Sequence, residues 1–135
     1  LVNCGLHDIK RYSNRPDPQV PVDRYRSNLE QIVETSRSLS EQLVWMRTTP
    51  VDEATHNGRQ PAFSRFEEDL NTYNMAADKV MRAAAIPIID LFGFTLQLGK
   101  DLYVDHVHFN EDIRQQQAAF IAGWLTAYAA ISEAR

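Results

Sequence analysis

The sequence lacks the features that define several large protein classes. A single cysteine, Cys4, stands among 135 residues, which excludes an internal disulfide framework. Long hydrophobic runs are absent, and none approaches the ~18 apolar residues of a membrane-spanning helix. Excess basic charge is absent too, because the formal net charge is −4, so we expect no nucleic-acid partner. No internal repeat or low-complexity segment is visible.

Composition and length are those of an ordinary globular domain. Apolar residues make up 44% and charged residues 24% of a chain long enough to bury its own core. The chain opens with Leu1 inside an apolar stretch, although an unpaired strand end leaves buried backbone groups without hydrogen bonds. We therefore expect residues 1–135 to be a single domain that lacks its beginning. A targeting segment would be missing with it, so the sequence predicts no localisation.

Apolar runs and helical patterns alternate along the chain. Short continuous apolar runs are typical of strands buried on both faces, whereas apolar steps of three and four residues indicate amphipathic helices. This alternation predicts a parallel sheet with helices packed on it, an α/β fold built as a three-layer α/β/α sandwich. The predicted strands are residues 1–5, 43–46 and 86–91; the predicted helices are residues 25–39, residues 63–84 and the stretch after Asn110; the predicted loops surround Pro16, Pro18 and Pro21 and span residues 52–62.

Capping residues predict where two helices begin. Ser64 followed by Glu67 has the spacing of a capping box. Asn110 precedes the final helix, and we expect its side chain to accept a hydrogen bond from the first turn. The tryptophans Trp45 and Trp124 are expected in the core. The final helix has a broad apolar face that we also expect to be buried: Ile113, Phe120, Ile121, Trp124, Leu125, Tyr128 and Ile131.

Polar residues follow the apolar runs at residues 5–8, 48–50 and 105–108. Because parallel strands place their carboxyl ends at one edge of a sheet, we expect these loops to converge there and form a ligand site. Asp105 and His108 stand three residues apart. The Asp105 carboxylate can accept a hydrogen bond from Nδ1–H of His108, which fixes the tautomer and leaves Nε2 as a general base.

Two other interpretations of these residues stay open. Asp105 and His108 can belong to a solvated loop that only precedes the final helix. Alternatively, His106 and His108 can bind a metal with Asp105, although no further cluster supplies obvious ligands apart from His7. We expect no metal and no other cofactor. Cys4 is expected to be a small buried residue rather than a nucleophile, because nothing in the sequence indicates a lowered thiol pKa.

Four blocks of the sequence, in this order, resemble the SGNH or GDSL-type serine esterase superfamily, and within it the PC-esterase branch. In that family the nucleophile is a serine in a Gly-Asp-Ser motif after the first strand. A Gly-x-Asn-Asp loop helps to stabilise the oxyanion, and an Asp-x-x-His loop supplies acid and base. The matching blocks here are Asn3-Cys4-Gly5-Leu6-His7-Asp8-Ile9, Leu43-Val44-Trp45-Met46-Arg47-Thr48-Thr49-Pro50, Ile88-Ile89-Asp90-Leu91 and Asp105-His106-Val107-His108-Phe109-Asn110.

The resemblance implies a flavodoxin-like sandwich that hydrolyses a small acyl ester or an acetylated glycan without a cofactor. By position, Asp105 and His108 match the catalytic pair. Gly5 and His7 match the oxyanion loop, where His7 replaces the usual asparagine and its imidazole can still donate a hydrogen bond. Arg47 follows the second predicted strand, and we expect it to form an ion pair rather than to contact a substrate.

No Gly-Asp-Ser occurs in the sequence. We therefore expect the nucleophilic serine, and the first strands of the sheet, to lie upstream of Leu1, and the chain alone to be inactive. The alternative is a non-catalytic binding or interaction protein that has this fold without the serine. A sheet without its first strands would expose an edge and an apolar face, which predicts self-association.

Overall fold

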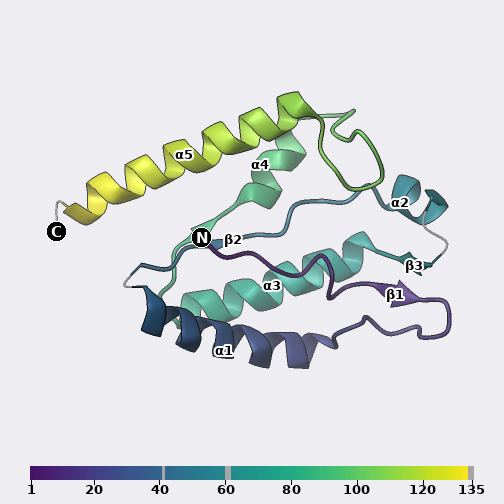
Figure 1. Cartoon of the computed structure of the whole chain (residues 1–135), viewed down its shortest axis with the longest axis horizontal. Coiled ribbons are helices and arrows are strands. Elements are labelled where there is room, and N and C mark those ends of the chain that lie inside the picture. The colour runs from purple at the N-terminus through teal and green to yellow at the C-terminus, as the bar shows by residue number, and fades with distance from the viewer. Residues whose placement is uncertain (41, 60–61, 134–135) are drawn as a thin grey trace.

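The computed structural model describes residues 1–40, 42–59 and 62–133. Helices and short strands alternate along this part of the chain (Figure 1). In chain order the elements are β1 (Arg11–Tyr12), α1 (Val22–Leu39), β2 (Trp45–Met46), α2 (Glu53–Arg59), β3 (Phe63–Ser64), α3 (Glu67–Ala83), β4 (Ile88–Ile89), α4 (Leu91–Gln97) and α5 (Glu111–Glu133).

A small parallel sheet lies at the centre of the fold. β2 pairs in parallel with β4, so that Trp45 is opposite Ile88. On the other side of β2, Val2 forms a parallel bridge: its amide donates to the Val44 carbonyl at 3.0 Å, and the Met46 amide donates to the Val2 carbonyl at 2.9 Å. The three predicted strands therefore are neighbours and run in parallel. The first of them lies at an edge and is not buried, since Leu1 is 60% exposed.

Helices cover both faces of this sheet (Figure 1). Successive side chains of a strand point to opposite faces. Trp45 accordingly belongs to the core formed with α1 and α3, whereas Val44 and Ile89 belong to a second cluster under α4 and α5. The predicted packing of helices on a parallel sheet is confirmed to this extent. A sheet as wide as that of a complete three-layer sandwich stays a prediction.

The core between α1 and α3 follows the predicted periodicity. Tyr25, Leu29 and Val33 are the buried positions of α1. They meet an α3 stripe that includes Leu70 and Tyr73. α1 begins at Val22, three residues before the predicted start, because the backbone of Pro21 (φ −55°, ψ 144°) leads directly into a helix.

The capping box predicted at Ser64 and Glu67 is wrong. Ser64 lies in β3 and pairs with Arg11 of β1 in a two-stranded antiparallel sheet. α3 begins at Glu67, and the amide of Glu67 donates to Oε2 of Glu53 at 2.8 Å. A carboxylate from a different helix thus satisfies the free amide that the capping serine was expected to satisfy.

The loop predicted over residues 52–62 is also wrong, because residues 53–59 of it form α2. Asp52 caps this helix: its Oδ1 accepts from the Thr55 amide at 2.9 Å, and its Oδ2 accepts from the Thr55 hydroxyl at 2.7 Å. These bonds hold the pKa of Asp52 below its usual range. Gly58, which suggested a loop, lies within the helix.

α5 differs most from expectation. Asn110 caps it as predicted, since its Oδ1 accepts from the Ile113 amide at 3.0 Å. The broad apolar face is only half-buried, however: Ile113 and Gln117 are buried, Trp124 is not, and Ile131 is 58% exposed. The half-buried residues of this α5 face pack on Val44, Ile89 and Leu91 and are Phe120, Ile121, Trp124 and Leu125.

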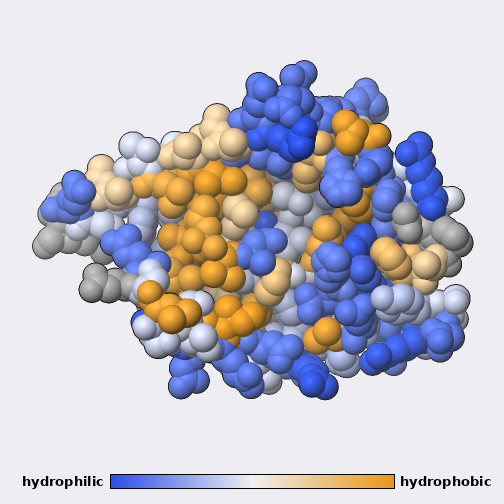
Figure 2. Space-filling model, viewed as in Figure 1, coloured by the Kyte–Doolittle hydropathy of each residue, from blue (hydrophilic) through white to orange (hydrophobic). Residues whose placement is uncertain are grey.

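Figure 2 shows apolar side chains gathered on one side of the molecule between α5 and α1. The edge of the sheet at Val2 lies in the same region (Figure 1). Neither α5 nor any other described helix is both long and apolar enough to cross a membrane. The α5 face is therefore incompletely covered in this chain. Monomers rarely expose contiguous apolar patches of this kind.

We predict that the chain self-associates through the α5 face. Leu125→Lys should shift the elution of the isolated chain toward the monomer in size-exclusion chromatography, because a charge on this face opposes its burial against another molecule. Ala127→Lys is the matched control, since Ala127 is exposed on the same helix. A wild-type chain that elutes as a monomer at micromolar concentration would contradict the prediction.

Candidate active site

Asp105 and His108 form the hydrogen bond that their spacing predicts. Nδ1 of His108 lies 2.6 Å from Oδ2 of Asp105. The other carboxylate oxygen, Oδ1, accepts from the backbone amides of Val107 and His108, both at 2.8 Å. The His108 side chain, followed by these amides, holds the pKa of Asp105 far below its usual range. Asp105 therefore stays anionic and orients the imidazole of His108.

The Nε2 edge of His108 faces solvent. The His108 side chain is 74% exposed, whereas that of Asp105 is 39% exposed. With the Nδ1 proton directed at Asp105, Nε2 of a neutral His108 is a free proton acceptor. An imidazole nitrogen in this arrangement can act as a general base toward a group placed within hydrogen-bond reach.

Local contacts hold the loop that carries this pair, residues 105–108, called the histidine loop below. The Val104 amide donates to the His108 carbonyl at 2.8 Å. The rings of Tyr103 and Phe109 stack across the base of the loop with centroids 4.8 Å apart. The Asn110 cap of α5 follows directly. The chain thus enters and leaves the loop at two packed and hydrogen-bonded points, which fixes the orientation of Asp105.

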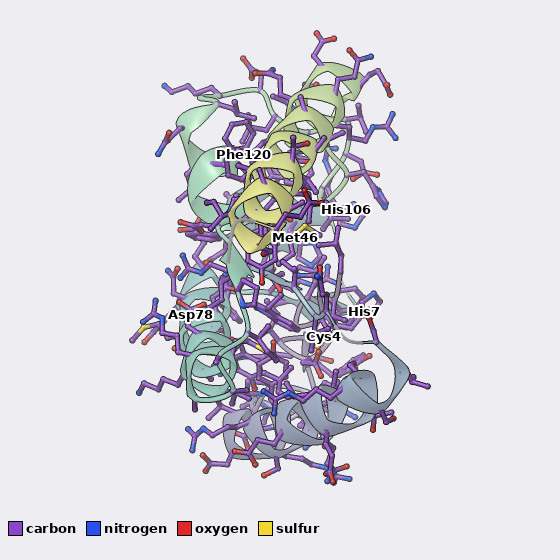
Figure 3. The ribbon with its side chains drawn as sticks, turned by 90° about the vertical axis from the view of Figure 1, so that its left-hand side faces the viewer. Cys4, His7, Met46, Asp78, His106 and Phe120 are labelled. Atoms are coloured by element: carbon purple, nitrogen blue, oxygen red, sulfur yellow. The ribbon has the colours of Figure 1, made fainter. Side chains whose placement is uncertain are left out.

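The loop of residues 5–8, called the glycine loop below, forms a tight turn. The amides of Asp8 and Ile9 both donate to the Gly5 carbonyl, at 2.9 and 3.2 Å. Gly5 has a φ of 138°, and a Cβ there would lie 2.9 Å from the Thr48 hydroxyl oxygen. This site therefore requires glycine. His7 is exposed at the tip of the turn, and Figure 3 shows it on the same side of the molecule as His106.

A buried polar network fixes the base of the glycine loop. The hydroxyls of Thr48 and Tyr25 both donate to the Cys4 carbonyl, at 3.0 and 2.9 Å. Thr48 is held in turn by Asn74 of α3: the Thr48 amide donates to Asn74 Oδ1, and Asn74 Nδ2 donates to the Thr48 carbonyl, both at 3.0 Å. Thr48 and Asn74 are almost completely buried. The backbone groups of Thr48 and the side-chain amide of Asn74 therefore satisfy each other, and losing either partner would leave buried polar groups without hydrogen bonds, at a cost in stability.

Residues 48–50 join the two loops, as the predicted convergence at one edge requires. At one end of this segment Thr48 contacts Cys4, next to the glycine loop. At the other end the Tyr103 hydroxyl donates to the Pro50 carbonyl at 2.7 Å, next to the histidine loop. The three polar segments therefore lie at one end of the parallel sheet.

His56 and Arg65 form a second connection, which the sequence analysis missed. The ring of His56, on α2, lies 5.0 Å from the ring of His106. Nε2 of His56 lies 3.5 Å from Nη1 of Arg65, and Nε of Arg65 donates to the Leu6 carbonyl at 2.8 Å. The burial of His56 lowers its pKa to about 4, with help from the Arg65 charge. Both residues come from stretches where the sequence pattern carried no sign of their burial.

A pocket of about 550 Å³ borders Asp105 on the side of α2. Its lining mixes the carboxylates of Asp52, Glu67 and Asp101 with the cations of Arg59 and Lys100. Such a polar lining suits a hydroxylated or charged group better than an acyl chain.

The remaining predicted residues have structural contacts. Burial and the nearby Asp8 carboxylate raise the pKa of Cys4, which disfavours the thiolate. Arg47 pairs with Asp90 at 2.9 Å and with Asp78 at 3.4 Å, so the expected ion pair is present. Among the described residues no three His, Cys, Asp or Glu side chains gather closely enough to hold a metal ion. Nor does any hydrogen bond there join His7 to the Asp105–His108 pair.

The sequence matches no family model and no curated protein. Among solved structures it is similar to the lipase/acylhydrolase from Enterococcus faecalis, with a TM-score of 0.67 and 19% sequence identity. The superposition covers 87% of this chain and 56% of that protein. The chain therefore shares the fold of a lipase/acylhydrolase and spans little more than half of its length.

We predict that Asn74→Ala destabilises the fold by about 2–6 kcal/mol, because it leaves the buried amide and carbonyl of Thr48 unpaired at ~1–3 kcal/mol each. Urea denaturation measures the change. Asn71→Ala on the exposed side of α3 is the control and should change the free energy of unfolding by less than ~1 kcal/mol. Equal effects of the two substitutions would show that the Thr48 bonds do not stabilise the fold.

Acid should destabilise the fold through His56. Below about pH 6.5 the unfolded chain protonates this histidine, whereas the folded chain, with its pKa of about 4, does not. The free energy of unfolding should therefore fall between pH 6.5 and 4 by up to ~3 kcal/mol and level off below.

Urea denaturation of the wild type and of His56→Gln across this pH range isolates the effect, since other titrating groups are common to both proteins. The wild type should lose more stability than the variant. Parallel pH profiles would mean that His56 is protonated equally in the folded and unfolded chains.

Proposed function

We propose that this chain is part of an ester hydrolase that acts by acyl transfer to water, with Asp105 and His108 as two members of its triad. The observation that carries the proposal is the 2.6 Å bond between Asp105 and Nδ1 of His108, which leaves Nε2 free at the surface. The fold shared with a lipase/acylhydrolase supports it. The assignment to the SGNH or GDSL superfamily, to its PC-esterase branch and to a complete three-layer sandwich belongs to the same proposal.

In this mechanism a serine hydroxyl loses its proton to Nε2 of His108 and attacks the ester carbonyl. The charged imidazole is stabilised by Asp105 and then protonates the leaving alcohol. Water, deprotonated by His108, releases the acid. The amide hydrogens of residues 5–7, together with the imidazole of His7, donate to the developing oxyanion.

We place the nucleophilic serine on a segment outside this chain. The serine hydroxyls whose hydrogen bonds are described, at Ser27, Ser38, Ser40 and Ser132, donate to nearby backbone carbonyls. The sheet edge at Val2 and the α5 face are the surfaces onto which we expect the serine-bearing strand and its helix to pack. The substrate class we propose is a small acyl ester or an acetylated glycan.

The second candidate is a binding or interaction protein of the same fold. It is favoured by one observation, that no serine among the described residues is hydrogen-bonded to His108. In this case Asp105 and His108 would contact a ligand without attacking it. The residue at the end of the strand next to Val2, in the complete reading frame, separates the two candidates.

The test is hydrolysis of a chromogenic acetate ester by the complete gene product. His108→Ala should reduce kcat/KM by ~10³-fold or more, and Asp105→Asn by a comparable factor, because both act as a unit with the nucleophile. His7→Ala should cost on the order of 10²-fold if its imidazole is an oxyanion donor. Residues 1–135 alone should show no turnover above the buffer rate.

Asp112→Asn is the matched control for Asp105→Asn, since Asp112 is exposed at the start of α5 and should leave the rate unchanged. An active gene product that His108→Ala does not impair would overturn the proposed triad. A complete gene product without activity on any ester would favour the binding protein.

A further inference from the structure

Three contacts run from the glycine loop to the histidine loop through the interior. Arg65 donates from Nε to the Leu6 carbonyl at 2.8 Å. Its Nη1 reaches Nε2 of His56 at 3.5 Å. The His56 ring lies 5.0 Å from that of His106, with 33° between the ring planes. Figure 1 shows α2, which carries His56, beside the loop that precedes α5. The two halves of the candidate active site are thus linked by the side chains of two residues.

Arg65 is held firmly in this position. Asn57 forms two hydrogen bonds with its backbone: Asn57 Nδ2 donates to the Arg65 carbonyl at 3.0 Å, and the Arg65 amide donates to Asn57 Oδ1 at 2.9 Å. The guanidinium lies 4.9 Å from the centre of the Phe63 ring. The backbone of Arg65 is therefore anchored to α2, the helix that also carries His56.

Arg65 is also unusual in its electrostatics. It is 4% exposed and has no salt bridge to a carboxylate among the described residues, whereas Arg11 pairs with Asp69 and Arg47 pairs with Asp78 and Asp90. A buried cation without a counter-ion is costly, and stability alone would favour an apolar residue at this place. The hydrogen bonds of its side chain go to the glycine loop and to His56, which points to a role in connecting them.

His56 must be neutral to complete the connection. Arg65 can only donate, so Nε2 of His56 accepts and the ring proton resides on Nδ1. Nδ1 is buried and has no hydrogen-bond partner among the described residues. The ring is 0% exposed, between Phe63 at 5.5 Å and His106. The His56 ring is therefore in direct contact with the histidine loop.

We propose that Arg65 and His56 are positioning residues that couple the glycine loop to the histidine loop, so that the oxyanion donors and the general base keep one relative placement. This inference rests on the proposed ester hydrolysis for its catalytic meaning. The coupling itself is a property of residues 1–135 and is testable without activity. Neither residue touches the reacting atoms.

The first experiment follows backbone amide and imidazole NMR signals in the isolated chain. Of the two loops, Arg65 contacts only the glycine loop, so Arg65→Met perturbs that loop directly. His56 contacts only the histidine loop, so His56→Phe perturbs that one directly. If the loops are coupled, Arg65→Met shifts the His106 and His108 signals, and His56→Phe shifts the amides of Leu6 and His7. If each variant moves only the loop that it contacts, the proposal is overturned.

Val80→Ala is the control for general destabilisation. Val80 is buried near the C-terminal end of α3 and lines the same surface hollow as Arg37, which lies near the C-terminal end of α1. It should weaken the core without shifting the signals of either loop. His56→Phe keeps an aromatic ring against His106, so its effect reports the nitrogen contact with Arg65 rather than lost packing. If Val80→Ala shifts both loops as strongly as Arg65→Met does, the coupling is not specific and the proposal fails.

The second experiment measures ester hydrolysis by the complete gene product. Arg65→Met and His56→Phe should each lower kcat by ~10- to 100-fold, because a misplacement of about 1 Å is enough for such a loss, while KM changes less than ~3-fold. Arg65→Lys should restore part of kcat, since a lysine can still donate to Leu6. The double variant should lose little more than either single variant.

Independent, multiplicative losses in kcat would overturn the coupling. An inactive wild-type gene product with coupled NMR signals would instead remove the proposed ester hydrolysis and leave the mechanical link between the loops established. Unchanged kcat in both variants of an active enzyme would show that the link has no role in positioning.

Discussion

The arrangement of the candidate active site depends on one buried interaction, the paired hydrogen bonds between Asn74 and Thr48. The side-chain amide of Asn74 accepts from the Thr48 amide and donates to the Thr48 carbonyl, both at 3.0 Å between nitrogen and oxygen. Thr48 lies two residues after the end of β2. This fixes the direction in which the chain leaves the sheet. The Thr48 hydroxyl can then donate to Cys4, and Pro50 can accept from Tyr103. Both loops are therefore positioned from α3, the most deeply buried helix.

The two loops nevertheless obtain their shapes from different sources. The histidine loop is local: Asp105 is bonded to residues two and three positions away, and Asn110 closes it against α5. The glycine loop depends on distant residues, namely Tyr25, Thr48 and Arg65. This difference explains what the sequence could predict. A bond across three residues can be inferred from spacing, whereas a contact across 59 residues, such as Arg65 to Leu6, leaves no local pattern.

The same distinction accounts for the errors in secondary structure. The periodicity of α1 and α3 and the parallel order of the strands follow from apolar spacing, which the core preserves. Ser64 had the right local chemistry for a helix cap, but it pairs with Arg11 of β1 as part of a strand. The Glu67 amide donates to the Glu53 carboxylate instead. The polar residues 52–62 and their glycine predicted a loop, but the Asp52 cap begins α2, and Phe63, packed against His56, contacts this short helix from outside. Tertiary contacts thus decided the case of Ser64, and a local cap with a tertiary contact decided that of α2.

The incomplete burial of the α5 face is of a different kind, because an apolar pattern predicts that a face is covered without indicating by what. A strand added beside Val2 in the parallel direction would end at the same edge as β2 and β4, since parallel strands place their carboxyl ends together. Its last residue would then lie next to the glycine loop, which follows the Val2 strand directly. The exposed Nε2 of His108 opens at this end of the sheet as well. In the proposed hydrolase, one added strand with its reactive residue at the carboxyl end would both cover this surface and bring a nucleophile toward His108.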